Sequence, residues 1–188
     1  MHNIVIFNGS ARKGQFTEHV TKLMADVISK NPELTATAVD PRKLNITITD
    51  EAAGANFPEL TEIMQKADAY IIVAPEYNHG YPGSLKYILD LNLKQYIHKP
   101  VAFVGVSAGP FGGARVIENL VPVVRELGMV ATFNDVNISQ VQNEFNEDHT
   151  LKEPEKWAKR VERMLSELVW MTQTLKHGRE TFPSEHHE

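Results

Sequence analysis

The chain has 188 residues, 42% of them hydrophobic and 23% charged, which is typical of one soluble domain with a substantial core. Its formal net charge of −5 argues against a general nucleic-acid-binding protein, and the absence of cysteine excludes disulfides, thiolate metal ligands and a cysteine nucleophile. No apolar run approaches the roughly 18 residues of a membrane span, and the opening MHNIVIFNGS is typical of a strand rather than a signal peptide, so a cytoplasmic protein is expected.

Short apolar runs alternate with amphipathic segments along the chain. Strands are predicted, in order, at 3–8, 35–40, 69–74, 100–107 and 129–138, and helices at 17–30, 58–67, 83–95, 113–127 and 153–176. Pro122 is expected to interrupt the fourth helix, and a loop is expected at 41–56. Residues 177–188 are predicted to form a polar tail that frays.

Five strands alternating with helices predict a doubly wound α/β sheet. We expect one domain over residues 1–176, with the parallel strands in the order 2-1-3-4-5. In that order a ligand binds at the carboxyl ends of the strands, where the loops after strands 1, 3 and 4 converge. These are also the three loops whose composition is unusual in this sequence.

The loop after the first strand, NGSARKGQFTEHV, combines glycines with hydrogen-bond donors at Ser10, Arg12 and Thr17. It leads into a helix N-terminus, where free N–H groups and the helix dipole favour a phosphate. It matches neither G-x-x-x-x-G-K-[ST] nor G-x-G-x-x-G, so a phosphate monoester fits better than a nucleoside triphosphate or a dinucleotide. The alternative is a solvated turn in which Thr17 is an ordinary N-cap.

The loop after the third strand, PEYNHGYPG, permits close backbone approach at Gly80, and Tyr77 and Asn78 can orient a planar heterocycle. The alternatives are packing of Tyr77 between loop and core, and a solvated or capping carboxylate at Glu76. His79 is expected to be an exposed loop histidine rather than a metal ligand, because no partner stands at ligand spacing.

The loop after the fourth strand, SAGPFGGARV, has three glycines around a Pro-Phe pair and should form a thin wall. Opposite the preceding loop it would leave a slot about one aromatic ring thick, which with the phosphate loop describes flavin mononucleotide (FMN). For Arg115, a salt bridge with Glu118 or with a neighbouring chain is at least as reasonable as ligand contact.

Three motifs carry a resemblance to a known family: G-S-A-R-K-G at 9–14, P-E-Y-N-x-x-x-P-G-x-L-K at 75–86 and G-P-F-G-G-A-R at 109–115. With them, most of residues 3–140 resembles the NAD(P)H-dependent FMN reductases, a flavodoxin-like group that includes quinone, azo-dye and chromate reductases. The resemblance implies a three-layer α/β/α domain. The sequence departs from the family pattern at Gln15, where Ser is usual, and at Thr17, where Asn is frequent.

The resemblance implies which residues contact FMN and which chemistry follows. The phosphate would be held by the first loop, the ribityl chain and ring edge by the second, and the ring by the third, through Ser10, Arg12, Gln15, Phe16, Thr17, Pro75, Glu76, Tyr77, Asn78, Ser107, Gly109 and Gly112. No catalytic side chain and no metal are expected, because the flavin carries the chemistry.

The implied activity is transfer of hydride from NADPH or NADH through flavin N5 to a small acceptor: a quinone, an azo compound, a flavin or a metal oxyanion. The family also implies a homodimer or homotetramer, and no nucleic-acid or membrane partner is expected. Two alternatives are a flavodoxin-type electron carrier and a flavin-binding sensor, neither of which would turn over NAD(P)H.

Overall fold

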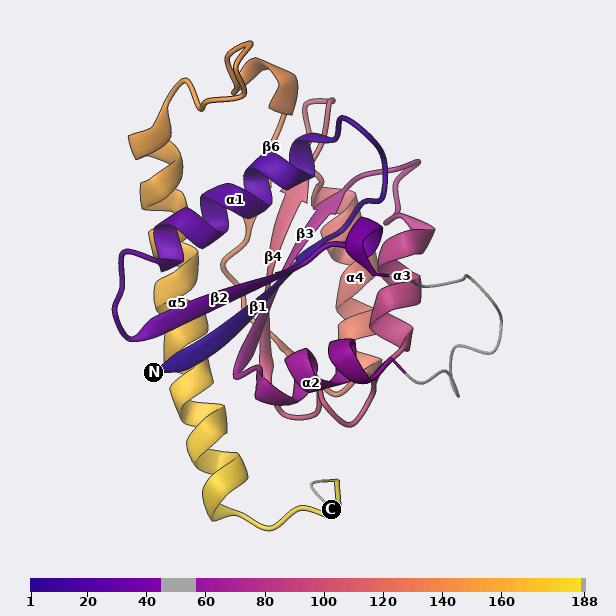
Figure 1. The fold of residues 1–188 in the computed structure, drawn as a ribbon, viewed down its shortest axis with the longest axis vertical. Helices are drawn as coiled ribbons and strands as arrows, with labels where there is room; N and C mark the ends of the chain where they lie inside the picture. The colour runs from indigo at the N-terminus through magenta and orange to yellow at the C-terminus, as the bar shows by residue number, and fades with distance from the viewer. Residues whose placement is uncertain (45–56, 187–188) are drawn as a thin grey trace.

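The computed structural model describes residues 1–44 and 57–186 as an α/β domain (Figure 1). Its strands are β1 (His2–Asn8), β2 (Leu34–Val39), β3 (Ala69–Pro75), β4 (Pro100–Val106), β5 (Val130–Ala131) and β6 (Val136–Ile138). Its α-helices are α1 (Phe16–Ile28), α2 (Pro58–Lys66), α3 (Gly83–Asp90), α4 (Ala114–Glu126) and α5 (Pro154–Thr181), with short 3-10 turns at Pro41–Lys43 and Val141–Asn143. Most of the loop predicted at 41–56 lies outside the described residues.

The strands form one parallel sheet in the order β2-β1-β3-β4-β5, which confirms the predicted topology. The central pairings include Val5 opposite Tyr70 and Ile72 opposite Phe103. Because the strands are parallel, the loops after β1, β3 and β4 all leave the same edge of the sheet. We call them loop 1 (residues 9–15), loop 2 (residues 76–82) and loop 3 (residues 107–113).

The single fifth strand predicted at 129–138 is wrong, because the structure divides it into β5 and β6, and both pair with β4. Between these pairings β4 advances three residues, from Val101 to Val104, whereas its partner advances five, from Ala131 to Val136. The surplus residues leave the ladder and carry the exposed Phe133. An edge strand tolerates such an interruption more easily than a central one.

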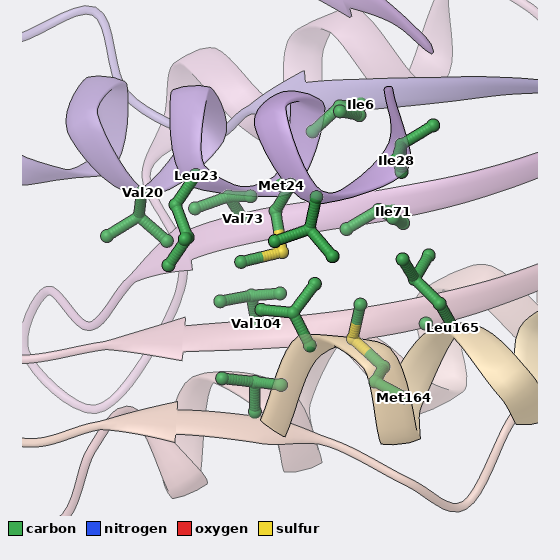
Figure 2. Close-up of a cluster of buried hydrophobic side chains, with 14 of the residues drawn as sticks. Ile6, Val20, Leu23, Met24, Ile28, Ile71, Val73, Val104, Met164 and Leu165 are labelled. Atoms are coloured by element: carbon green, nitrogen blue, oxygen red, sulfur yellow. The ribbon is translucent and has the colours of Figure 1, made fainter. Parts of the chain in front are cut away.

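Two hydrophobic cores lie on opposite faces of the sheet, as the alternation of side chains along each strand requires. On β1, Ile4 and Ile6 face α1 and α5, whereas Val5 and Phe7 face α2, α3 and α4. Figure 2 shows the first core, where Met24 of α1 and residues of α5 such as Met164 and Leu165 lie against the strands. The predicted three-layer α/β/α arrangement is therefore confirmed.

Three predicted helix features differ from the structure. Helix α3 ends at Asp90 rather than at 95, after which the chain turns to bury Tyr96 against the ring of Tyr70. Helix α4 is continuous through Pro122. Helix α5 runs to Thr181 instead of ending at 176, and Arg179 Nη1 donates a hydrogen bond of 2.6 Å to the His98 carbonyl. That contact holds the last turn of the helix against the domain.

Candidate functional site

Direct contacts join loop 1 to β3 and to loop 2 at the carboxyl edge of the sheet. The Gly9 N–H donates to the Val73 carbonyl at 2.8 Å, and a Cβ built on Gly9 would lie 2.5 Å from that oxygen. Loop 1 therefore packs on β3 in a way that requires glycine. The Ser10 and Tyr77 hydroxyls lie 3.0 Å apart and connect loop 1 to loop 2. Loops 1 and 2 are thus in contact, and loop 3 leaves the same edge of the sheet from the neighbouring strand β4.

Loop 1 is held from within by a buried glutamine. The Gln15 amide nitrogen donates to the Ser10 carbonyl at 2.7 Å, and its oxygen accepts a hydrogen bond from the Thr17 hydroxyl. Gln15 is the N-cap residue of α1, but its side chain makes no capping hydrogen bond. The first N–H groups of α1 have no partner within the helix and are therefore available to an anion. Thr17 is not the N-cap that the alternative interpretation required.

The other predicted residues of this region have different orientations. The exposed guanidinium carbon of Arg12 lies 5.8 Å from the centre of the Tyr77 ring, so Arg12 sits beside the junction of loops 1 and 2. The Phe16 ring packs against Phe145 and His149, with ring centres 5.7 and 6.4 Å away. The Phe16 side chain therefore belongs to a separate aromatic cluster, and only its backbone is placed to serve a ligand at the start of α1.

Loop 2 is a tight turn on the end of β3. Tyr77 and Gly80 exchange two backbone hydrogen bonds of 2.9 Å, and the residues between them, Asn78 and His79, have φ angles of 50° and 69°. Positive φ at both central positions is characteristic of a type I′ turn, which asparagine adopts readily. Pro75 forms the last pair of the β3–β4 ladder, so the turn projects directly from the sheet edge.

Arg115 of α4 ties this turn to the neighbouring helix. Its Nε and Nη2 atoms lie 2.7 and 2.6 Å from Oε1 of Glu76, and its Nη1 lies 2.8 Å from Nε2 of His79. Arginine can only donate hydrogen bonds, so His79 Nε2 is the acceptor. The pairing of Arg115 with Glu118 considered from the sequence is wrong. The Glu76 side chain is 6% exposed, so a solvated carboxylate is wrong as well.

Loop 3 lies against the segment that follows β6. The Ser107 hydroxyl donates to the Gly109 carbonyl at 2.9 Å, and that carbonyl also accepts from the Gln140 N–H at 3.0 Å. A Cβ on Gly112 would lie 2.8 Å from the Asn137 Cβ, whereas a Cβ on Gly109 would have nothing within 4 Å. The lack of a side chain is therefore a packing requirement at Gly112, and Gly109 is the glycine that faces open space.

An ion pair network fixes the start of α1 beside the site. Arg42 lies 2.8 Å from Glu18 of the first turn of α1 and also pairs with Asp40 at the end of β2. Burial alone would raise the pKa of Asp40, but hydrogen bonds from Arg42 outweigh it and hold that pKa below its ordinary value. Arg42 therefore balances the negative charges of Glu18 and Asp40 near loop 1. With these charges paired, a bound anion at the N-terminus of α1 is repelled less.

A doubly wound parallel sheet with a phosphate-type loop, a tight turn and a glycine-rich wall at its switch point defines a nucleotide- or flavin-binding α/β protein. The model of the NADPH-dependent FMN reductase family matches residues 2–143. The chain belongs to this family, and the resemblance found in the sequence is confirmed.

Named relatives support the same family. The chain is 33% identical over 122 residues to a quinone reductase of Escherichia coli (60% of this chain, 63% of the relative), and 30% identical over 118 residues to an NADPH azoreductase of a Bacillus species (62% and 65%). The matches thus span somewhat less than two thirds of these relatives. Among solved structures, the FerB flavoenzyme NAD(P)H:(acceptor) oxidoreductase of Paracoccus denitrificans shares the fold, with a TM-score of 0.72 at 18% identity over 92% of this chain and 98% of that one.

A further structural neighbour is general stress protein 14 of Treponema denticola, solved in complex with FMN. The two structures align over 91% of this chain and 99% of that protein, with a TM-score of 0.58 and 14% sequence identity. In the part of the chain that the structure describes, no helix is long and apolar enough to cross a membrane.

Some contacts at the site could not be predicted from the sequence. Asn119 donates from its side chain to the His79 carbonyl at 2.9 Å and so anchors the turn to α4, but nothing in its sequence surroundings marks it. The Arg115–Glu76 pair joins residues 39 positions apart. The sequence motifs contain Glu76 and Arg115 separately, and their pairing follows from the strand order of the sheet.

Proposed function

We propose that this chain binds FMN in the crevice between loops 1, 2 and 3 and reduces a small acceptor with electrons from NADPH or NADH. The observation that carries the proposal is the hydrogen bond between loops 1 and 2 at the carboxyl edge of the sheet, where loop 3 also begins, together with membership of the FMN reductase family. Acceptors of the proposed class are quinones, azo compounds, flavins and metal oxyanions. The first two are supported by the names of the relatives.

The residues present fit an FMN molecule. The N–H groups at the start of α1 and the exposed Arg12 would hold the phosphate, and the hydrogen bond between the buried Ser10 and Tyr77 would fix loop 2 beside it. The backbone of Pro75, Glu76, Tyr77 and Asn78 would follow the ribityl chain and the ring edge. Gly109, with open space at its Cα, would line the ring together with Ser107.

The bound flavin would supply the redox chemistry, accepting hydride from NAD(P)H and passing two electrons to the acceptor. The chain's own part is to hold the phosphate, to orient the ring and to keep one ring face open for each substrate in turn. No side chain of the chain is assigned a catalytic role in this proposal, and no metal is invoked.

We also propose a cytoplasmic homodimer or homotetramer. Large apolar side chains are exposed around the α3–α4 side of the molecule: Leu93 after α3 is 55% exposed, Phe111 in loop 3 is 61% exposed and Val121 on α4 is 40% exposed. Such side chains are suited to an interface between copies. Light scattering coupled to size exclusion measures the mass, and a monomer with FMN bound would contradict this part of the proposal.

The test of the function is the visible absorption spectrum of the purified protein after FMN addition and desalting, followed by anaerobic titration with NADPH and NADH. A retained flavin band that either nucleotide bleaches is expected. A retained band that neither nucleotide bleaches would favour the electron carrier or the sensor. Failure to retain or bind FMN, measured also by fluorescence titration, would contradict the proposal.

A further inference from the structure

Residues 145–151, which we call the hairpin, lie over the first turns of α1. Phe145 and Leu151 form an antiparallel bridge at the base of the hairpin. The buried Phe145 ring anchors this base on α1, because its centre lies 5.7 Å from the ring centre of Phe16. The matched family model ends at residue 143, so the hairpin lies beyond it.

Two histidines form a second contact between the hairpin and α1. His19 of α1 and His149 of the hairpin stack face to face, with ring centres 4.3 Å apart and ring planes 12° from parallel. The φ angle of His149 is 64°, a left-handed conformation that is uncommon outside glycine. His149 is exposed and both rings line a surface groove, so protons from solvent reach the pair.

The charge of the pair is what makes this contact depend on pH. A first proton is shared by stacked rings without a like charge opposite it, but a second proton places two positive charges at the 4.3 Å separation of the rings, where they repel. The charged groups around the pair are Glu18, Lys22, Asp26 and Lys30 of α1 and Asp148 of the hairpin, while α5 contributes the uncharged Pro154 and Ala158 to the groove.

These neighbours leave the histidines as the groups that titrate near pH 6. Hydrogen bonds from Thr150 hold the pKa of Asp148 below its ordinary value, so this carboxylate stays ionised in mild acid. Burial, followed by the charge of His149, lowers the pKa of His19 against the opposing effect of Glu18. A hairpin that opens removes this burial, so the open state binds a proton more tightly and acid favours opening.

We propose that the His19–His149 stack is a pH-sensitive switch that holds the hairpin on α1 until both rings are protonated, and then releases it. Release removes the ring contacts of Phe16, the first residue of α1, so the start of that helix loosens together with the hairpin. The helix dipole acts in the same direction, because it disfavours a positive charge near the N-terminus of α1. The inference goes beyond the proposed function and requires no bound flavin.

The test is hydrogen exchange of the flavin-free, full-length protein, measured by mass spectrometry on peptides that cover the hairpin and the first turn of α1. From about pH 7.5 to about pH 5, exchange corrected for its intrinsic pH dependence should accelerate at least about fivefold, the factor that two charges at this separation produce in water. In His19→Phe the rings can still stack but only one can be protonated, so the corrected exchange should change less than about twofold.

His177→Phe is the matched control, because it removes an exposed histidine near the other end of α5 and should behave like the wild type. In the wild type at about pH 5, raising KCl from about 0.05 M to about 0.5 M should recover part of the protection, since salt screens repulsion between exposed charges. Equal acceleration in His19→Phe, no acceleration in the wild type, or no recovery in salt would overturn the inference. Because no flavin is added, each of these results leaves the proposed function untouched.

Discussion

Loop 1 contains one arginine, and its role can be separated from that of the rest of the loop. Arg12 is exposed and lies over the Tyr77 ring, next to the start of α1. Replacing it with alanine should weaken FMN binding by about 1.5–3 kcal/mol, the scale of a hydrogen bond to a charged group. Riboflavin, which has no phosphate, should bind equally well to both proteins. Fluorescence titration measures both affinities.

The neighbouring Lys13, also exposed, provides the control. Lys13→Ala removes the same charge from the same loop and should change FMN affinity by less than about 0.5 kcal/mol. If Arg12→Ala retains wild-type FMN affinity, or if riboflavin is weakened equally, Arg12 does not hold the phosphate.

Gly109 offers a steric test of the slot. A Cβ at this position meets nothing within 4 Å, and its φ lies outside the left-handed range, so Gly109→Val should change the stability of the flavin-free protein by less than about 0.5 kcal/mol. With the ring against loop 3, the added methyl groups should lower FMN affinity at least about tenfold, in keeping with the cost of overpacking. Unchanged affinity would move the ring away from Gly109.

Gly112 cannot serve for the same test. Its φ is +59° and an added Cβ would lie 2.8 Å from the Asn137 Cβ, so Gly112→Val should destabilise the flavin-free protein itself. A loss of FMN in that variant would report on folding. The two glycines look alike in the sequence, and their difference arises from β6, which no pattern in the sequence placed beside loop 3.

The sequence indicated which loops would lie at the carboxyl edge of the sheet, but not the direction of their side chains. Glycine-rich loops after apolar runs marked the candidate site, and which of their residues contact a ligand stays a prediction. Whether Gln15 points outward to a phosphate or inward to the Ser10 carbonyl depends on a hydrogen bond within the loop. Likewise, the contact of Glu76 with Arg115 depends on β3 and β4 being neighbours.

Loop 1 as an element depends on Gln15. The residue is 7% exposed, and its side chain joins the Ser10 carbonyl to the Thr17 hydroxyl. Gln15→Leu keeps the approximate volume but leaves both partners without this contact, so it should lower the free energy of unfolding by about 1–3 kcal/mol. FMN affinity should fall too, because the N–H groups of α1 lose their fixed position.

Urea unfolding of the flavin-free protein measures the stability change. Gln173→Leu, at an exposed position of α5, is the matched control and should stay within about 0.5 kcal/mol of the wild type. If Gln15→Leu is as stable as the wild type, the side chain does not support the loop, and the departure from the family at this position has another cause.

The strands and helices were predictable to different degrees. Central strands such as β3 are buried on both faces and therefore appear in the sequence as continuous apolar runs, which makes them easy to locate. The structure confirms the predicted position of β3. The break between β5 and β6 was missed because an edge strand is constrained by one neighbour only. The end of α5 was placed too early because its last turns are polar in sequence, and the contact of Arg179 with the His98 carbonyl, which holds these turns against the domain, joins residues far apart in the chain.

The two ends of the sheet have opposite roles in the molecule. The carboxyl edge carries the candidate flavin site, and the amino edge carries a cluster of charged groups that anchors α5, the long yellow helix that runs past the sheet in Figure 1. Lys176 lies 3.0 Å from Asp68, and Asp68 also accepts from the Asn3 N–H at 2.9 Å. Substitutions in this cluster therefore change stability without touching the flavin site.

Lys99 is the buried member of that cluster and makes stability depend on pH. It is 8% exposed, and its ammonium group donates to the Met64 carbonyl at 2.9 Å, at the carboxyl end of α2. Burial, with a smaller contribution from Arg179, lowers its pKa to about 8. In the unfolded chain a lysine has a pKa of about 10.4.

Between these two values the unfolded chain binds a proton that the folded protein has released, so the contribution of Lys99 to the free energy of unfolding rises with pH. Below pH 8 both states are protonated and the folded protein bears the full cost of the buried charge. In Lys99→Met this dependence is absent. The stability of the wild type relative to Lys99→Met should therefore increase by about 2–3 kcal/mol from pH 7.5 to pH 10.

Chemical denaturation of both proteins at several pH values gives this difference. Taking the difference is essential, because burial raises the pKa of Tyr70 and Tyr96, and their titration in the unfolded chain lowers the stability of both proteins near pH 10 and above. A difference that stays constant over this range, or that moves in the opposite direction, would show that Lys99 keeps its proton in the folded protein. The helix end at Met64 would then hold a permanent charge, and the coupling between pH and the attachment of α2 would be absent.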